Sequence, residues 1–74
     1  MKNPRCLKQG LSFPEAYELI DYLYGHLIDI KTITDEYGVN HIKGFFEGSH
    51  VVNYNSEYGC IMISDDFIKE IRKA

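Results

Sequence analysis

The chain has no tryptophan, two cysteines, two prolines and no long run of apolar residues. A membrane-spanning helix needs about 18 or more consecutive apolar residues, so no span and no membrane partner are predicted. The opening segment, Met1–Lys8, lacks the apolar stretch of a signal peptide, and we therefore expect a cytoplasmic protein. In that reducing compartment Cys6 and Cys60 are predicted to be free thiols.

Several kinds of chemistry lack the residue spacing that they need. Three histidines, His26, His41 and His50, and the two cysteines form neither a Cys-x-x-Cys nor a His-x-x-x-His pattern, so no metal and no cofactor are predicted. Cys60 could act as a nucleophile with His41 as its base, but a buried cysteine is more often a small hydrophobic residue. A chain this short is also expected to leave little room for a pocket of about a few hundred Å³. We therefore predict a protein that is not an enzyme.

An excess of basic residues is also absent. The chain carries 8 Lys and Arg against 11 Asp and Glu, and its net charge is −3. This balance does not favour charge-driven binding to duplex nucleic acid. The 74 residues form one domain, predicted over residues 12–74 after a loosely ordered lead-in over residues 1–11. A domain of this size has a thin stability margin, which association with a second copy would increase.

One short phrase is present twice. Asp35–Val39 and Ser56–Cys60 both contain Glu-Tyr-Gly, and β-branched or aromatic residues flank both copies. Glycine adopts a positive φ without steric cost, as the last residue of a three-residue hairpin loop requires. The repeat therefore predicts two β-hairpins of the same design.

Helices are predicted on both sides of this central region. Ser12 and Glu15 form a capping-box pattern before an amphipathic segment, and Gly25 is predicted to end that helix. Ser64, followed by two aspartates, is a good start for a second helix near the end of the chain.

The turn residues allow the strand registers to be worked out. Loops at Glu36–Gly38 and Glu57–Gly59, with a two-residue turn at Gly48–Ser49, predict three sets of facing pairs: Ile28 with Phe46, Ile30 with Gly44 and Thr32 with Ile42; Phe46 with Val51 and Gly44 with Asn53; Asn55 with Ile61 and Asn53 with Ile63. One sheet face then carries Ile28, Ile30, Ile42, Phe46, Val51, Ile61 and Ile63. We therefore predict an α+β fold of order α-ββββ-α, a four-stranded antiparallel meander covered on one face by two helices.

A second arrangement uses the same residues as a winged helix-turn-helix. The Tyr-Gly-Val turn, the Phe-Phe pair and the Ile-Met-Ile-Ser-Asp-Asp-Phe step resemble the layout of the winged-helix family across residues 12–74. The resemblance implies helices over Thr32–Tyr37 and His41–Phe46, and a DNA-binding regulator. The meander is favoured, because residues 30–34 include four β-branched residues and the candidate recognition helix has Gly44 at its middle.

The other face of the predicted sheet is the candidate binding surface. It carries Asp29, Lys31, Ile33, His41, Lys43, Phe45, Val52, Tyr54, Cys60 and Met62. Lys31 lies opposite Lys43, and one interpretation is that long lysine stems cover Phe45 and Tyr54 while their charges reach water. The functional interpretation is a surface for a protein partner or a homodimer, with Phe45, Val52, Tyr54 and Met62 as contacts and Lys31 and Lys43 as orienting charges. We predict a small protein-binding or regulatory module; binding of single-stranded nucleic acid to this face is less favoured.

Overall fold

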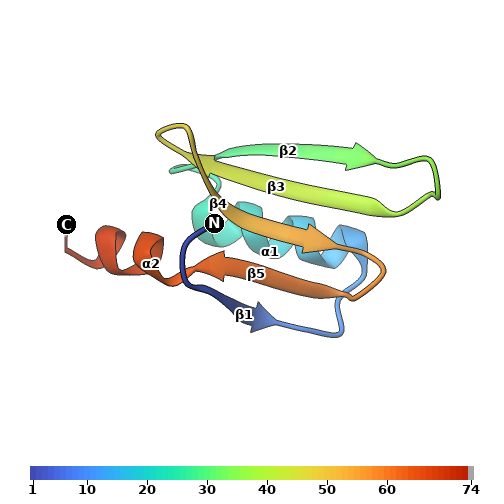
Figure 1. The fold of residues 1–74 in the computed structure, drawn as a ribbon, viewed down its shortest axis with the longest axis horizontal. Helices are drawn as coiled ribbons and strands as arrows, with labels where there is room; N and C mark the ends of the chain where they lie inside the picture. The colour runs from blue at the N-terminus through green and yellow to red at the C-terminus, as the bar shows by residue number, and fades with distance from the viewer. Residues whose placement is uncertain (74) are drawn as a thin grey trace.

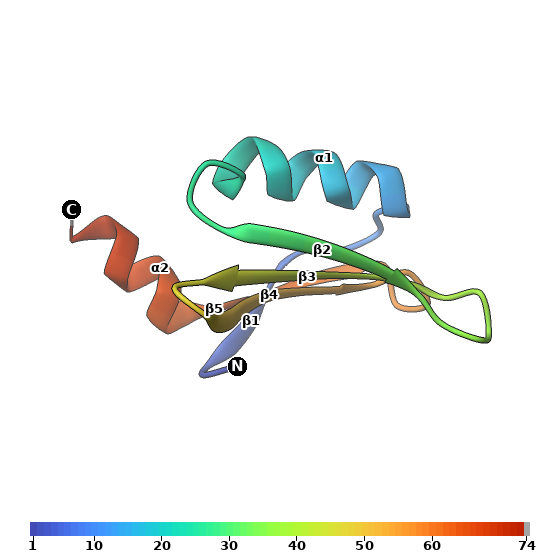
Figure 2. The ribbon, with the colours of Figure 1, turned by 90° about the horizontal axis from the view of Figure 1, so that it is seen from above.

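A five-stranded antiparallel sheet with one helix across it forms the body of the molecule (Figures 1 and 2). The computed structural model describes residues 1–73. The elements follow in the order β1 (Pro4–Lys8), α1 (Phe13–Tyr24), β2 (Asp29–Thr34), β3 (Asn40–Phe46), β4 (Ser49–Asn55), β5 (Cys60–Ser64) and α2 (Asp65–Arg72). The strands lie side by side as β1-β5-β4-β3-β2. The α+β class is confirmed.

The first helix begins where its capping residues predict. Ser12 Oγ accepts a hydrogen bond from the Glu15 backbone N–H at 3.4 Å, and Glu15 Oε1 accepts one from the Ser12 N–H at 3.0 Å. Gly25 caps the other end. Ala16 and Ile20 are buried against the sheet, so α1 covers one sheet face, which becomes the core.

The second helix also begins as predicted. Ser64 Oγ accepts a bond from the Phe67 N–H, and Phe67 and Ile68 are buried. The Phe67 ring lies 5.6 Å from that of Tyr24 and 5.2 Å from that of Phe46, measured between centroids. Figure 1 places α2 beyond the end of the sheet, so the prediction that both helices lie across the sheet face holds only for α1.

The β2–β3 hairpin has the predicted register. Ile30 faces Gly44 and Thr32 faces Ile42. The Asp35 N–H donates to the Val39 carbonyl at 3.0 Å, and Gly38 has the positive φ of 80° that the loop requires. Residues 29–34 and 40–46 are therefore strands, and the helix-turn-helix alternative is wrong as a fold.

Gly44 is the point of closest approach within the core. A Cβ placed there would lie 2.8 Å from Ile28 Cδ1 and 3.0 Å from Val52 Cβ. The glycine that weakens a helical interpretation of this segment thus lets two aliphatic side chains meet over β3.

The prediction of four strands is wrong, because part of the expected lead-in forms a fifth. Pro4–Lys8 pairs with β5, placing Arg5 opposite Ile63 and Cys6 opposite Met62. This strand has only one partly buried side chain, Leu7, and its other side chains are exposed. An edge strand of this kind leaves no alternating hydrophobic pattern for the sequence to reveal.

The predicted pairing of β4 is also wrong. The β3–β4 turn is Glu47–Gly48 instead of Gly48–Ser49, so Phe46 faces Ser49 instead of Val51. An irregularity between Gly44 and Phe45 then leaves Val51 as an extra residue in β4, so Gly44 faces Val52 instead of Asn53. Across the next loop Asn55 faces Cys60, so that loop has four residues, Ser56–Gly59, instead of three.

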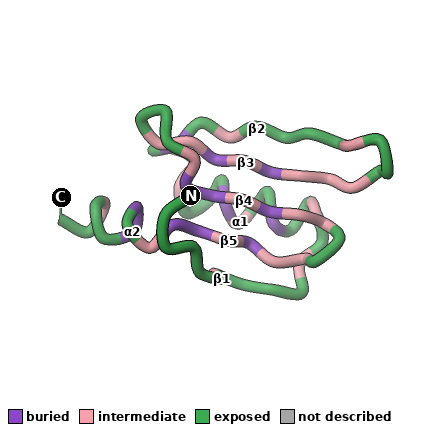
Figure 3. Tube along the Cα trace, viewed as in Figure 1, coloured by how far each residue is buried: buried purple, intermediate pink, exposed green. Residues whose placement is uncertain are grey.

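The extra residue reverses the faces of β4 from Val52 on, and the longer loop that follows restores the predicted faces of β5. The seven predicted core residues, Ile28, Ile30, Ile42, Phe46, Val51, Ile61 and Ile63, are all buried in the core or packed against it. Val52 and Tyr54 join them, although the sequence analysis placed both on the opposite face. Figure 3 shows this burial concentrated in α1, β3, β4 and β5, with β1 and β2 largely exposed.

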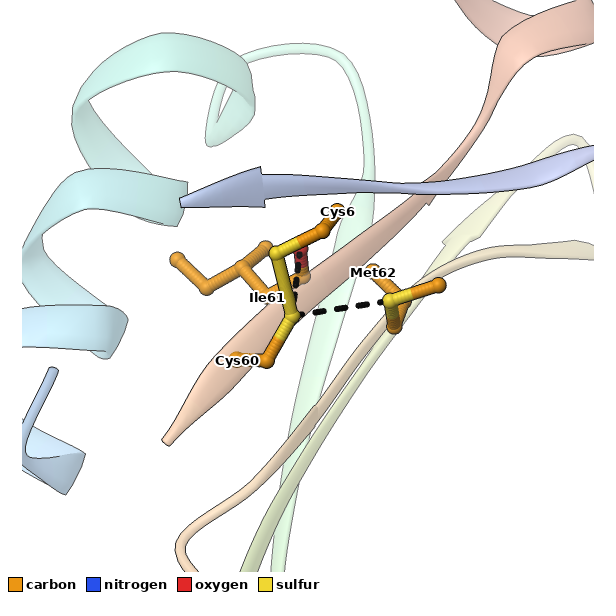
Figure 4. Close-up of a disulfide and its surroundings, with 4 residues drawn as sticks. All are labelled: Cys6, Cys60, Ile61 and Met62. Atoms are coloured by element: carbon orange, nitrogen blue, oxygen red, sulfur yellow. Dashed lines mark hydrogen bonds between the residues drawn. A yellow bond between two sulfur atoms is a disulfide. The ribbon is translucent and has the colours of Figure 1, made fainter. Parts of the chain in front are cut away.

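Cys6 and Cys60 join β1 to β5 as a disulfide, with their Cα atoms 6.4 Å apart (Figure 4). The prediction of free thiols is therefore wrong in this structure. Cys60 Sγ also lies 3.6 Å from Met62 Sδ. Within residues 1–73, no helix has the length and apolar composition needed to cross a membrane.

Candidate binding surface on the open sheet face

The candidate surface is the sheet face opposite α1, here called the open face. The registers place its side chains in three rows across the strands. The central row contains Lys31, Lys43, Asn53, Met62 and Cys6. The row toward α2 contains Asp29, Phe45 and His50, and the row toward the two Glu-Tyr-Gly loops contains Ile33, His41, Asn55 and Cys60. Figure 2 shows no helix on this side of the sheet.

Four of the six predicted contact residues lie on the open face: Lys31, Lys43, Phe45 and Met62. The placement of Val52 and Tyr54 there is wrong, because both side chains are fully buried on the α1 side. His50, Asn53 and Asn55 take their places, and sequence reasoning missed all three. The adjacent apolar pair Val51-Val52 is the signal that could have revealed the bulge, since regular alternation would send one of the two to solvent.

Tyr54 is a structural residue of the core. Its hydroxyl donates to the Leu11 carbonyl at 2.7 Å, which ties the segment between β1 and α1 to the sheet. Burial raises the pKa of Tyr54, and the nearby negative charge of Glu15 adds to that effect. Both causes favour the neutral phenol that makes this bond.

The two lysines of the central row face each other directly across β2 and β3. Lys31 Nζ lies 5.6 Å from the centroid of the Phe45 ring, so its stem and charge cover one aromatic side chain. The ion pairs within residues 1–73 involve Arg5, His41 and Lys69. Lys31 and Lys43 therefore have no ion pair with a carboxylate in that part of the chain, and like charges directly opposite each other destabilise the sheet.

Apolar and amide groups border these charges. The Phe45 ring packs against the His50 ring at a centroid distance of 5.4 Å. Phe45 and Met62 are partly exposed, and Ile33 at the edge is 51% exposed. The open face thus combines two unpaired cations, partly exposed apolar groups and the Asn53 amide, a composition suited to holding an acidic and partly apolar segment.

His41 is held by an acidic residue at one end of the surface. His41 Nε2 lies 2.9 Å from Asp35 Oδ2, while Asp35 Oδ1 accepts bonds from the Tyr37 and Val39 N–H groups. The bond with His41 lowers the pKa of Asp35, and the two backbone bonds act in the same direction. This arrangement closes a turn. Cys60 was considered as a nucleophile with His41 as its base. Its sulfur is bonded to Cys6, and Asn55 lies between Cys60 and His41 in the same row.

Apart from the open face, the structure has a concavity where the β3–β4 turn, α2 and residues 1–2 meet. Its volume is about 620 Å³, so the expectation of little room for a pocket is wrong. Glu47, Asp66 and Glu70 are among its lining residues, with Lys2 and His50. Among the described residues, His50 Nε2 is buried and has no hydrogen-bond partner. No group of three potential metal-ligating side chains comes together within residues 1–73.

No protein-family model, curated protein or solved structure matches this chain.

Proposed function

We propose that this protein is a non-enzymatic binding module whose open face holds an acidic, partly apolar segment of a partner protein. The observation that carries the proposal is the direct pairing of Lys31 with Lys43, with no carboxylate partner in the described chain. A facing lysine pair costs stability, and an incoming carboxylate removes that cost.

The lysines select the partner and the apolar groups hold it. Exposed ion pairs contribute about 0.2–1 kcal/mol each, so two lysines alone give little affinity. An aromatic anchor at the centre of an interface contributes about 2 kcal/mol or more. Phe45 lies under Lys31, and Met62 lies two positions beyond Lys43 in the same row. A segment that crosses the central row therefore meets both kinds of contact.

The proposal is tested by anisotropy of a fluorescent peptide that alternates glutamate with leucine and phenylalanine. A peptide with lysine in place of glutamate is the charge control, and a short oligothymidylate tests nucleic acid. The acidic peptide should bind, and Lys43→Glu should weaken that binding at least about tenfold, because an attraction becomes a repulsion. Lys8→Glu changes the net charge equally, but its side chain lies beside Glu15 of α1, so it should leave binding unchanged.

Chemical-shift mapping decides whether the open face is the site. Peptide addition should move the amide signals of Lys43, Asn53 and Met62 and leave those of α1 in place. Preference for the oligothymidylate would favour a nucleic-acid surface. Equal weakening by the two lysine substitutions would reject the open face as the binding site.

The cellular compartment in which the protein acts is tested through the redox state of its two cysteines. The sequence predicts a cytoplasmic protein, whereas a disulfide between Cys6 and Cys60 persists in oxidising compartments. Alkylation of the protein inside intact cells, before lysis, distinguishes the two. Two alkylated cysteines support the cytoplasm, and two protected cysteines support an oxidising compartment.

A further inference from the structure

The two edges of the sheet differ in how they are protected. At the β1 edge, Pro4 lacks an N–H group and the pairing is interrupted between Cys6 and Lys8. Both features discourage the addition of another strand. The β2 edge has neither. Asp29–Thr34 pairs with β3 without interruption, and five of its six residues are exposed.

The hydrogen bond that closes the β2–β3 loop identifies the free groups of this edge. The Asp35 N–H donates to Val39, so residue 35 and every second residue before it direct their backbone groups toward β3. The residues between them, Ile30, Thr32 and Thr34, must direct their N–H and C=O groups outward, because these groups alternate along an antiparallel strand. The β2 edge therefore offers an unused ladder of donors and acceptors.

We propose that a second copy of this chain occupies this edge, through antiparallel pairing of β2 with the partner's β2 about a two-fold axis. Charge complementarity and the free backbone groups together separate the possible registers. An axis at Ile30 would place Lys31 opposite the partner's Asp29, but Thr32 would then face the partner's Ile28, whose N–H already donates to the Tyr24 carbonyl. An axis at Lys31 would place the two copies of this lysine opposite each other. An axis at Thr32 would place Lys31 opposite the partner's Ile33. An axis at Ile33 places Lys31 opposite the partner's Asp35, and the symmetry repeats this pair.

The register centred on Ile33 also satisfies the other groups of the edge. Ile33, 51% exposed in the single chain, meets the partner's Ile33 on the open face. Thr32 and the partner's Thr34 form a hydrogen-bonded pair, which the symmetry repeats. Asp35 keeps its bonds to Tyr37, Val39 and His41, and the partner's Lys31 approaches the same carboxylate from across the edge. The result is one continuous sheet of two copies, with the two open faces joined on the same side.

Cysteine substitution tests the register directly. Side chains that face each other in a non-hydrogen-bonded pair have Cβ atoms close enough for a disulfide. Ile33→Cys should therefore give a covalent dimer under mild oxidation, at least about tenfold faster than Lys31→Cys, which serves as the matched control. Both variants keep the native Cys6–Cys60 pair. Equal rates for the two variants, or faster linkage of Lys31→Cys, would overturn the proposed register.

A backbone substitution tests the use of the edge itself. The Thr32 N–H points away from β3, so Thr32→Pro removes an edge donor without removing a bond of the β2–β3 ladder. Sedimentation over a concentration series should show a monomer–dimer equilibrium for the wild type and for Thr32→Val, and a monomer for Thr32→Pro. A wild type that stays monomeric throughout, or a Thr32→Pro variant that folds and still dimerises, contradicts the proposal. If Thr32→Pro does not fold, the cysteine pair decides alone.

This proposal does not rest on the acidic-segment function. Thr32→Pro should abolish dimerisation and leave the shifts caused by the acidic peptide at Lys43 and Met62 in place. Lys43→Glu should weaken the peptide and leave the backbone ladder of the dimer, which Thr32 and Thr34 form and which Lys43 in β3 does not touch. In the dimer Lys31 faces the partner's Asp35, so Lys43 is the lysine that remains for the peptide.

Discussion

Tyr54 contributes to the stability of the fold and is not part of the proposed binding surface. Its side chain is fully buried on the α1 side, and an aromatic side chain buries about 150–250 Å². At about 25 cal/mol per Å² that burial stabilises the fold by about 4–6 kcal/mol. Tyr54→Ala should therefore lower the free energy of unfolding by about 4 kcal/mol. A 74-residue domain has about 4–11 kcal/mol in total, so this variant should be close to unfolding at room temperature.

One further variant separates the hydrogen bond of Tyr54 from its ring, and another compares Tyr54 with an aromatic side chain of the open face. Tyr54→Phe keeps the ring and removes the 2.7 Å bond to the Leu11 carbonyl, which should cost about 1–2 kcal/mol. Phe45→Ala truncates a partly exposed ring on the open face and should cost about 1 kcal/mol. Urea unfolding followed by far-UV circular dichroism measures all three, since the chain has no tryptophan for fluorescence.

The order of the three values tests the reasoning. A loss for Phe45→Ala equal to that for Tyr54→Ala would contradict the assignment of Tyr54 to the buried face and of Phe45 to the open face. Alkali gives a second check. The pKa of Tyr54 is raised by burial, so its contribution is complete below the ordinary tyrosine pKa of about 10 and is lost as pH rises through the folded value. Tyr54→Phe should remove that part of the alkaline destabilisation; an unchanged alkaline profile would contradict the assignment.

Three other predictions follow from single contacts. Gly44→Val should destabilise the fold by about 2 kcal/mol or more in thermal or urea unfolding, because its Cβ would clash with Ile28 and Val52, and a loss under about 0.5 kcal/mol would contradict this packing. Cys6→Ser should cost about 4 kcal/mol, the loop-closure value for a cross-link between residues 54 apart, and wild type unfolded under strong reductant should show the same loss. Asp35 has a lowered pKa, so its contribution to the loop is present above about pH 4 and is lost as pH falls through its folded value. The protection factor of the Val39 amide against hydrogen exchange, which corrects for the intrinsic pH dependence, should fall there, whereas that of Asp35→Asn should stay flat.

The parts of the fold that the sequence predicts are those set by local chemistry. Ser12 and Glu15 specify the start of α1, and Asp35 and Gly38 specify the loop that fixes the β2–β3 register. In both cases a few neighbouring side chains bond to the backbone around them. Such contacts need no knowledge of the rest of the chain.

The parts that the sequence does not predict depend on distant partners. Pro4–Lys8 becomes a strand only because β5 lies beside it, and its own residues show no hydrophobic alternation. The face of β4 depends on an extra residue, Val51, and on the length of the following loop. An error of one residue at each place reversed Val52 and Tyr54 while leaving β5 correct. The residues that β2, β3 and β5 contribute to the open face were therefore open to prediction, and those of β1 and β4 were not.

The pairing of β1 with β5 has a consequence for synthesis on the ribosome. β1 has its sheet neighbour at residues 60–64, so during translation it cannot add to the sheet until the chain has been made through β5. Until then the segment is an unattached leader that chaperones or proteases can reach. Slow codons between β3 and β5 should therefore prolong the exposure of β1 more than that of the hairpin formed by β2 and β3.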